Sequence, residues 1–221
     1  MPKTTKEISG RTIARLAVYY CTLEKMRDEG ETICSSLQLE QQTGIASSLI
    51  RRDLSHFGGF GTKGVGYEID VLLAWIIEIL GYNTEWSSVL VGQGVPLTGI
   101  SNYDGMLPPG FNITAVVDLK KKNHGRKIPG LNLTINPLGK LANLIKSHNI
   151  PIGIVSVSPD NAQKVVDIMV KAGIKGIANF SSVPVHVPDN IPVSQVNVTS
   201  CLSQLSYNLT SMSTKAAPSL A

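Results

Sequence analysis

The sequence predicts an α/β protein in which a winged helix-turn-helix domain precedes a parallel sheet with crossover helices and a separate last helix. Two observations predict this order. Residues 50–67 read as the end of an amphipathic helix that runs into a glycine-rich hairpin. Beyond residue 86, short apolar runs alternate with amphipathic helical patterns, as expected for strands joined by crossover helices.

The helix-turn-helix pattern lies in the first third of the chain. A long helix is expected from Ser9 to Glu29, and a short one from Ser36 to Thr43. The glycine-bearing turn at residues 44–46 then leads into a second helix, for which Ser47 is the expected cap. A short helix, a glycine-bearing turn and a following helix are typical of DNA-binding domains.

The second helix of this pattern carries an apolar face and an opposite face of serine and arginine. Ile50, Leu54 and Phe57 fall at positions i, i+4 and i+7. The serines and arginines repeat on the other side, where guanidinium groups can grip guanine edges or phosphates in a major groove. Together with the hairpin, the candidate DNA-contacting residues are Ser47, Ser48, Arg51, Arg52, Ser55, Lys63 and Gly64.

The hairpin after this helix favours a wing. Its glycines permit tight turns close to another surface, and Lys63 lies near its tip. The spacing of these residues alone leaves one alternative open. In that alternative the segment is a generic helical domain, and its two arginines only face solvent. The glycine-rich hairpin argues against that alternative.

Bulk charge does not locate a nucleic-acid domain in this chain. The net charge is +4, yet residues 1–82 carry 9 Lys and Arg against 10 Asp and Glu, while residues 83–221 carry 11 against 6. The case for DNA therefore rests on Arg51, Arg52 and Lys63, with Asp53 as the one acid beside them. So small a basic set neutralises few phosphates per subunit, and we expect a dimer on a palindrome.

Composition is that of a globular protein long enough for two small domains. The chain has 221 residues, 43% hydrophobic and 16% charged. No apolar run approaches the roughly 18 residues of a membrane span, and residues 1–6 lack a secretion signal, so we expect a cytoplasmic protein. Cys21, Cys34, Cys201 and the four histidines match neither a disulfide framework nor a metal-ligand spacing, so no metal is expected.

The expected domain boundaries follow from the change in pattern. Residues 1–82 form the DNA-binding domain, residues 83–198 the sheet domain, residues 199–212 the last helix and residues 213–221 a disordered tail. A helix from Asp70 to Leu80 closes the first domain, and residues 81–86 are the expected linker. The strands and helices expected in the second are Ser88–Val91, Ile113–Val117, Leu131–Ile135, Leu138–Ser147, Ile152–Val157, Asn161–Ala172 and Lys175–Ala178.

Glycines follow the first strand of the sheet domain, and Asp118 ends the second. Glycine after a buried strand lets a pyrophosphate approach, and an acid on the next strand can accept hydrogen bonds from an adenosine ribose. Leu97 stands where the third glycine of this Rossmann-like motif belongs, so the site is either working or impaired. The candidate cofactor-binding residues are Gly92, Gln93, Gly94, Val95, Pro96, Leu97 and Asp118.

Three alternatives accompany this dinucleotide site. The Lys120–Lys122 run could hold a ribose phosphate, as in NADP or coenzyme A recognition, although charge runs are usually solvated surface. A nucleotide- or coenzyme-A-binding enzyme on the same sheet would need a catalytic arrangement, and no such His/Asp or Lys/Tyr set is evident. A redox-inert scaffold would show no preference for any duplex sequence. We expect a regulator and no enzyme.

Specific segments along nearly the whole chain resemble the Rex-type redox-sensing transcriptional repressors. The resemblance implies a homodimer that exchanges its last helix between subunits and binds palindromic operators. It places Arg51 and Arg52 in the major groove and Lys63 in the minor groove, with NADH releasing the repressor and NAD+ compatible with binding. The matching segments are residues 15–20, 50–58, 61–67, 91–94, 102–103, 172–180 and 205–207.

Departures from the family pattern gather in the sensing half. The family has glycine at Leu97 and often an acid at Lys120. It also joins an arginine, a tyrosine and an aspartate in a redox-dependent contact, and the matching positions are Arg15, Tyr103 and Asn197. Because Asn197 carries no charge, that contact loses its charge-assisted strength. We expect a repressor with NAD(H) as its cofactor by resemblance, and with a reduced, altered or absent response to NADH.

Overall fold

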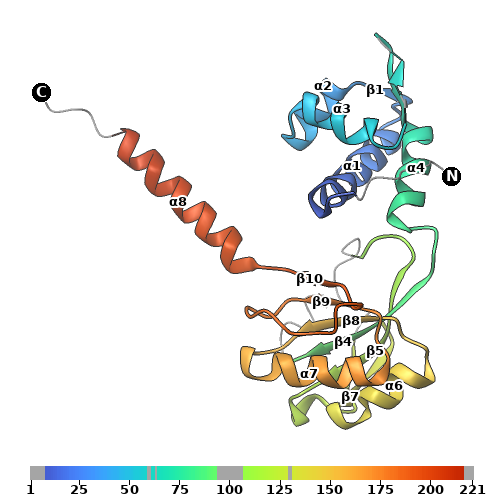
Figure 1. The fold of residues 1–221 in the computed structure, drawn as a ribbon, viewed down its shortest axis with the longest axis vertical. Helices are drawn as coiled ribbons and strands as arrows, with labels where there is room; N and C mark the ends of the chain where they lie inside the picture. Colours follow the sequence, from blue (N-terminus) through green and yellow to red (C-terminus); the bar gives the residue numbers. More distant parts are fainter. Residues whose placement is uncertain (1–7, 59–60, 63, 94–106, 129–130, 217–221) are drawn as a thin grey trace, which may run out of the picture. The chain divides into compact units, whose positions relative to one another are not determined.

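The computed structural model describes residues 8–58, 61–62, 64–93, 107–128 and 131–216. The chain divides into two compact units, Met1–Thr84 and Glu85–Ala221 (Figure 1). The first is helical with a small antiparallel sheet, and the second is built on a larger parallel sheet. The predicted fold class is confirmed.

The first two helices of the first unit begin after serines that cap them. Ser9 caps the first helix by accepting the Thr12 N–H at 3.2 Å. Ser35 and Gln38 form a reciprocal capping box at the second helix, which ends at Gly44 with φ 70°. The helices are α1 (Gly10–Asp28), α2 (Ser36–Thr43), α3 (Ser47–Ser55) and α4 (Ile69–Leu80).

The predicted wing is a three-stranded antiparallel sheet in the order β1 (Ile33–Cys34), β3 (Gly66–Glu68) and β2 (Gly61–Thr62). Gly66 has φ 116°, and a Cβ at this position would lie 2.5 Å from the Cys34 carbonyl oxygen. Only glycine meets both conditions, because its backbone tolerates positive φ and it has no Cβ to collide. This glycine therefore sets how closely the wing strands approach.

A single apolar cluster holds the first unit together. The cluster includes Ile50 and Leu54 of α3. Because these side chains are buried, the opposite face of α3 is the one that remains exposed. Its fully buried members include Leu16, Tyr19, Leu23, Leu39, Ile50, Ile69, Leu72 and Leu73.

The second unit is a seven-stranded sheet in which neighbouring strands are parallel except for one edge pair. From β4 the chain moves outward through β5 and β7, then returns to place β8 on the other side of β4. The strand order reverses between β4 and β8, and in doubly wound sheets ligands bind at the carboxyl ends of the strands at such a point. In spatial order the strands are β10 (Val193–Gln195), β9 (Gly176–Asn179), β8 (Ile152–Ser156), β4 (Trp86–Gly92), β5 (Phe111–Asp118), β7 (Leu133–Pro137) and β6 (Lys127–Ile128).

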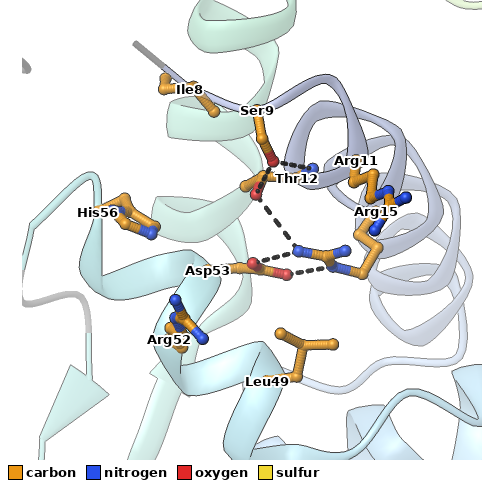
Figure 2. A pocket seen from close by; sticks show the side chains of 9 residues that line it. All are labelled: Ile8, Ser9, Arg11, Thr12, Arg15, Leu49, Arg52, Asp53 and His56. Carbon is orange, nitrogen blue, oxygen red and sulfur yellow. Dashed lines mark hydrogen bonds and ion pairs between the residues drawn. The ribbon is translucent and has the colours of Figure 1, made fainter. Parts of the chain in front are cut away.

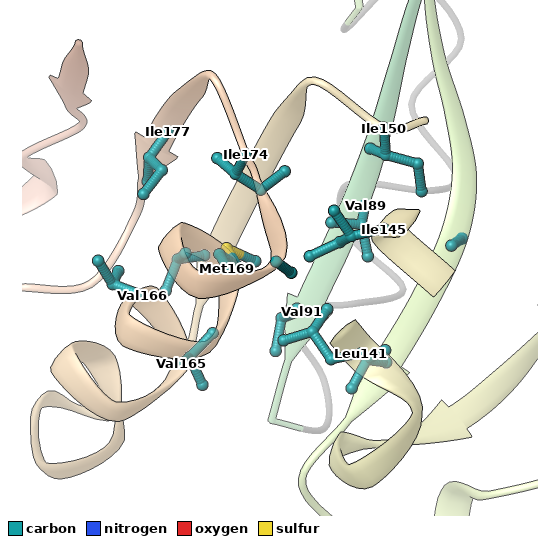
Figure 3. Packing of buried hydrophobic residues seen from close by; sticks show 14 of the residues in the cluster. Val89, Val91, Leu141, Ile145, Ile150, Val165, Val166, Met169, Ile174 and Ile177 are labelled. Atoms are coloured by element: carbon teal, nitrogen blue, oxygen red, sulfur yellow. The ribbon is translucent and has the colours of Figure 1, made fainter. Parts of the chain in front are cut away.

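Helices α6 (Leu141–Ser147) and α7 (Pro159–Ala172) pack on one face of this sheet (Figure 3). Short 3₁₀ helices lie at Lys121–Asn123 and Leu138–Lys140. A Cβ at Gly153 would lie 2.6 Å from the Met169 sulfur, so glycine permits the close approach of α7 to β8. The last helix, α8 (Val198–Ala216), follows β10.

Some element boundaries differ from the sequence predictions. Strand β7 starts later than expected, because Asn132 adopts a turn conformation with φ 51°. Trp86 was expected in the linker, yet its N–H donates to the Gly110 carbonyl at 2.6 Å and it begins β4. Helix α8 continues to Ala216, past its expected end at Met212, while residues 217–221 lie outside the described residues.

Candidate functional site

The outward face of α3 presents the polar side chains that the sequence predicted. Ser48, Arg51, Arg52 and Ser55 are exposed, whereas Ile50 and Leu54 on the opposite side are buried. The Arg51 Nη1 donates to the Ser36 Oγ at 2.8 Å, and the Ser55 Oγ donates to the Arg52 carbonyl at 2.7 Å. Two guanidinium groups are thus displayed together on a helix of DNA-reading type.

The start of α3 is organised differently from the prediction. Ala46, not Ser47, occupies the N-cap and makes no side-chain capping bond. Glu40 of α2 supplies the missing acceptor, taking the Ser47 N–H at 3.0 Å. Hydrogen bonds from Ser47 lower the pKa of the half-buried Glu40 carboxyl. The sequence pattern missed Glu40 because the capping group comes from another helix.

A hollow of about 460 Å³ separates α3 from the wing. Gly64 is exposed at the wing turn with φ 84°, and Lys63 lies outside the described residues. The Arg51 guanidinium and the backbone of the wing glycines border this hollow. Such a groove suits a polyanion that contacts both α3 and the wing. The residues that line it are Ser35, Ser36, Arg51, Gly61, Gly64, Val65, Gly66 and Tyr67.

Asp53 lies on α3 but points into the unit, toward α1 (Figure 2). The Arg15 Nε donates to its Oδ2 and the Arg15 Nη2 to its Oδ1, each at 2.6 Å. The Tyr19 hydroxyl donates to Oδ2 at 2.9 Å. This bidentate, charge-assisted contact ties the DNA-facing helix to α1.

The electrostatics of this contact correct the sequence reading of Asp53 as an acid beside the basic cluster. Burial alone would raise the pKa of the Asp53 carboxyl, but hydrogen bonds from Arg15 and Tyr19 outweigh it and lower the pKa. Burial and then the bond to Asp53 raise the pKa of Tyr19. Asp53 is therefore a buried anion already neutralised by Arg15, and it does not oppose the arginines outside.

A cavity of about 400 Å³ opens beside this ion pair, between the start of α1 and α3 (Figure 2). Its wall is rich in cationic side chains from both helices. The lining residues are Ile8, Ser9, Arg11, Thr12, Arg15, Leu49, Arg52, Asp53 and His56.

The glycine motif begins at the carboxyl edge of the larger sheet. Gly92 is buried at the end of β4, beside Asp118 of β5 and Ser156 of β8. The Gln93 Oε1 accepts the Ser158 N–H at 3.1 Å, which joins the loops that follow β4 and β8. The predicted residues Gly94, Val95, Pro96 and Leu97 lie outside the described residues.

Asp118 is buried, with 1% of its surface exposed, and both carboxylate oxygens bind within its own loop. Oδ1 accepts the Lys120 N–H at 2.7 Å, and Oδ2 accepts from the Asn123 Nδ2 at 2.6 Å. The His124 Nε2 donates to the Asp118 carbonyl at 2.8 Å, because a carbonyl oxygen can only accept. Sequence reasoning missed Asn123 and His124, although an aspartate that bonds two residues ahead is a common turn signal.

The three redox-switch candidates have separate environments. Arg15 is paired with Asp53 inside the first unit. The Asn197 Oδ1 accepts the Ser200 N–H at 2.9 Å, so Asn197 caps α8. Tyr103 lies outside the described residues.

Helix α8 carries an exposed apolar stripe. Val198, Leu202, Leu205 and Leu209 are each at least 55% exposed. An exposed apolar stripe of this length on a helix is typical of a surface that packs against a partner.

Within the described residues, no helix has the length and apolar character required to cross a bilayer. No three His, Cys, Asp or Glu side chains in the same residues converge as metal ligands would.

Comparisons with known proteins agree with both halves of the fold. A family model described as "Putative DNA-binding protein N-terminus" matches residues 7–55, and one described as "CoA binding domain" matches residues 83–183. The redox-sensing transcriptional repressor Rex of Carboxydothermus hydrogenoformans is 38% identical over 92% of this chain and 97% of its own. Rex 1 of Thermotoga maritima is 37% identical over 88% and 92%.

Solved structures show the same likeness. The crystal structure of RSP in complex with β-NAD+ and operator DNA is 32% identical, with a TM-score of 0.84 and 95% of each chain covered. RSP in complex with β-NADH is 30% identical, with a TM-score of 0.83 and coverage of 95% of this chain and 97% of RSP.

A helix-turn-helix unit joined to a doubly wound sheet defines a transcription regulator with a nucleotide-type sensing domain. The chain belongs to the Rex family of redox-sensing transcriptional repressors. The predicted family is confirmed, and membership in a family of repressors bears out the prediction of a regulator over an enzyme.

Proposed function

We propose that this protein is a sequence-specific repressor that binds a palindromic operator as a homodimer. The observation that carries the proposal is the exposed face of α3, where Arg51 and Arg52 stand outward while the opposite face is packed in the core. The RSP complex with operator DNA, 32% identical to this chain, supports the same use of the domain. In this proposal Arg51 and Arg52 enter the major groove and Lys63 reaches the minor groove.

The homodimer is supported by α8, whose apolar stripe is exposed along its length. Exchange of this helix between two copies would bury the stripe and pair two DNA-binding units, as a two-fold operator requires. We place the protein in the cytoplasm, where a repressor meets DNA.

The sheet unit is proposed to bind a nucleotide of the NAD(H) class, with a reduced or altered response to NADH. RSP complexes with β-NAD+ and β-NADH support the ligand class. Three substitutions support the altered response: Leu97 for glycine, Lys120 for an acid, and the uncharged Asn197 for an aspartate.

NADH titration with and without operator tests this proposal. Fluorescence anisotropy of a labelled operator gives the affinity for DNA, and NADH fluorescence gives the affinity for the nucleotide. We expect strong preference for operator over random duplex and weak NADH binding. Micromolar or tighter NADH binding would refute the impaired response, and equal affinity for operator and random DNA would refute the repressor.

A single substitution tests the effect of Leu97 on NADH binding apart from the effects of Lys120 and Asn197. Leu97→Gly should strengthen NADH binding, because it restores the glycine that the third position of the dinucleotide-binding motif requires. Leu97→Ala is the matched control and should recover less. Unchanged NADH affinity in Leu97→Gly would remove Leu97 as the cause.

A further inference from the structure

Because β4 and β5 are adjacent and parallel, their carboxyl ends lie side by side at the same edge of the sheet (Figure 1). Gly92 pairs with Asp118, and the Leu119 N–H donates to the Gly92 carbonyl at 3.0 Å. In a doubly wound sheet, the loop after the second strand meets the adenosine ribose of a nucleotide held by the first. A ribose bound in this way would face the loop that follows β5.

The carboxylate expected to bind ribose hydroxyls is engaged elsewhere. Asp118 is buried, and its two oxygens receive the Lys120 N–H and the Asn123 amide. Its carbonyl receives His124. Asp118 thus acts as the anchor of its own loop.

That anchored loop displays cations. Lys120, Lys121 and Lys122 are all exposed, and the ion pairs among the described residues involve none of them. Asp118 is the one acid close to these lysines along the chain, because the sequence from Leu119 to Pro159 contains no Asp or Glu.

The loop is also held in one conformation before any ligand arrives. The Asn123 N–H donates to the Lys120 carbonyl at 3.0 Å, and the Gly125 N–H donates to the Ile135 carbonyl at 2.9 Å, which ties the loop to β7. Because the loop backbone is already fixed by these bonds, an anion has only the lysine side chains to order.

We infer that the nucleotide site of this protein selects an adenosine ribose that carries a phosphate. The inference rests on the proposed nucleotide site and names its ligand chemistry. A 2′-phosphate would come from NADP(H) and a 3′-phosphate from coenzyme A. The Asp118 carboxylate already accepts hydrogen bonds from its own loop and is not available to the hydroxyls of an unphosphorylated ribose. A ribose phosphate, in contrast, can accept charge-assisted hydrogen bonds from the lysines at 120–122.

Calorimetric titration of the full chain with three adenosine compounds tests this selectivity. The probes are adenosine 5′-monophosphate, adenosine 2′,5′-bisphosphate and adenosine 3′,5′-bisphosphate. One bisphosphate should bind at least about tenfold more tightly than the monophosphate. The 2′ compound identifies NADP(H) as the source, and the 3′ compound identifies coenzyme A.

Charge-reversal variants assign the effect to the loop. Lys120→Glu with Lys122→Glu should abolish the bisphosphate advantage, whereas Lys171→Glu, an exposed lysine of α7, should retain it. Equal binding of the three probes, or an advantage that survives in the loop variant, overturns the inference.

Operator binding by the same preparations separates this inference from the proposed function. Equal probe binding with intact operator preference overturns only the ribose-phosphate inference. Failure of every adenosine compound to bind overturns both the inference and the proposed nucleotide site. Loss of operator preference with a retained bisphosphate advantage supports the inference and refutes the repressor.

Discussion

Each unit of the protein buries an aspartate beside its candidate site, and the two are used in different ways. Asp53 is neutralised by an arginine from another helix, so it fixes the helix that displays Arg51 and Arg52. Asp118 accepts hydrogen bonds from two uncharged donors of its own loop, so it shapes the turn that displays the lysines. A buried acid next to a functional surface can therefore act as its scaffold, through either tertiary or local bonds.

The isosteric change of each aspartate to asparagine should separate the two roles by the largest difference in stability. Asp53→Asn leaves Arg15 facing a neutral amide, and we expect it to cost about 3 kcal/mol of unfolding free energy, at the lower end for a broken buried pair because Arg15 is partly exposed. Asp118→Asn keeps an oxygen for the Lys120 N–H but turns a donor toward the Asn123 amide, and it should cost about 1 kcal/mol.

Urea unfolding can report each unit separately, because Trp75 lies in α4 and Trp86 in β4. Fluorescence of Trp75 in a Trp86→Phe background follows the first unit, and the reverse background follows the second. Asp28→Asn, an exposed acid of α1, is the control and should change stability by less than about 0.5 kcal/mol. Equal costs for Asp53→Asn and Asp118→Asn would contradict the distinction.

The same ion pair makes the first unit sensitive to acid. Folding lowers the pKa of Asp53 below its ordinary value of 3.8. Its contribution to stability is therefore fully present above pH 3.8 and is lost as the pH falls through the lower folded pKa. The Asp53→Asn protein should lack this part of the acid transition when Trp75 fluorescence is followed against pH.

Next in size is the effect of the two outward arginines on DNA recognition. Arg51→Ala or Arg52→Ala should reduce discrimination between operator and random duplex by about 1–3 kcal/mol, because base-edge contacts are lost. Anisotropy titrations measure both affinities, with Lys25→Ala, an exposed lysine of α1, as the control. An equal loss on both duplexes would make the arginines phosphate contacts.

The wing lysine should give the smallest effect. Lys63→Ala should weaken binding to all sequences alike and reduce the salt slope of log affinity by about 1, because one phosphate contact is removed. Titrations over a salt series check this. A change confined to the operator would place Lys63 on a base edge.

Sequence patterns predicted the helices of the first unit well, because residues close together in the sequence determine where those helices begin, end and face the core. The capping serine before α2, the glycine after it and the apolar spacing of Ile50 and Leu54 define helices and their inner faces. The pattern could not show that Asp53 points inward, since its partner Arg15 is on another helix. Glu40 at the start of α3 escaped prediction for the same reason.

The alternation of apolar runs predicted the sequence of strands and helices in the second unit. It did not predict the hydrogen bonds at the carboxyl edge of the sheet. Asp118 stood out because it ends a buried strand, and a ribose contact was the natural interpretation. Its engagement by Asn123 and Lys120 depends on the shape of a turn that apolar spacing does not encode. Asn197 was considered for its missing charge, whereas its amide oxygen caps α8.

Selection from a random duplex pool shows whether α3 recognises a DNA sequence. Full-length protein should enrich a palindrome and bind it about 10³-fold or more tightly than scrambled duplex at fixed salt. The Arg51→Ala and Arg52→Ala proteins should lose part of that ratio. Enrichment of no sequence, with equal affinity for all duplexes, would contradict the claim.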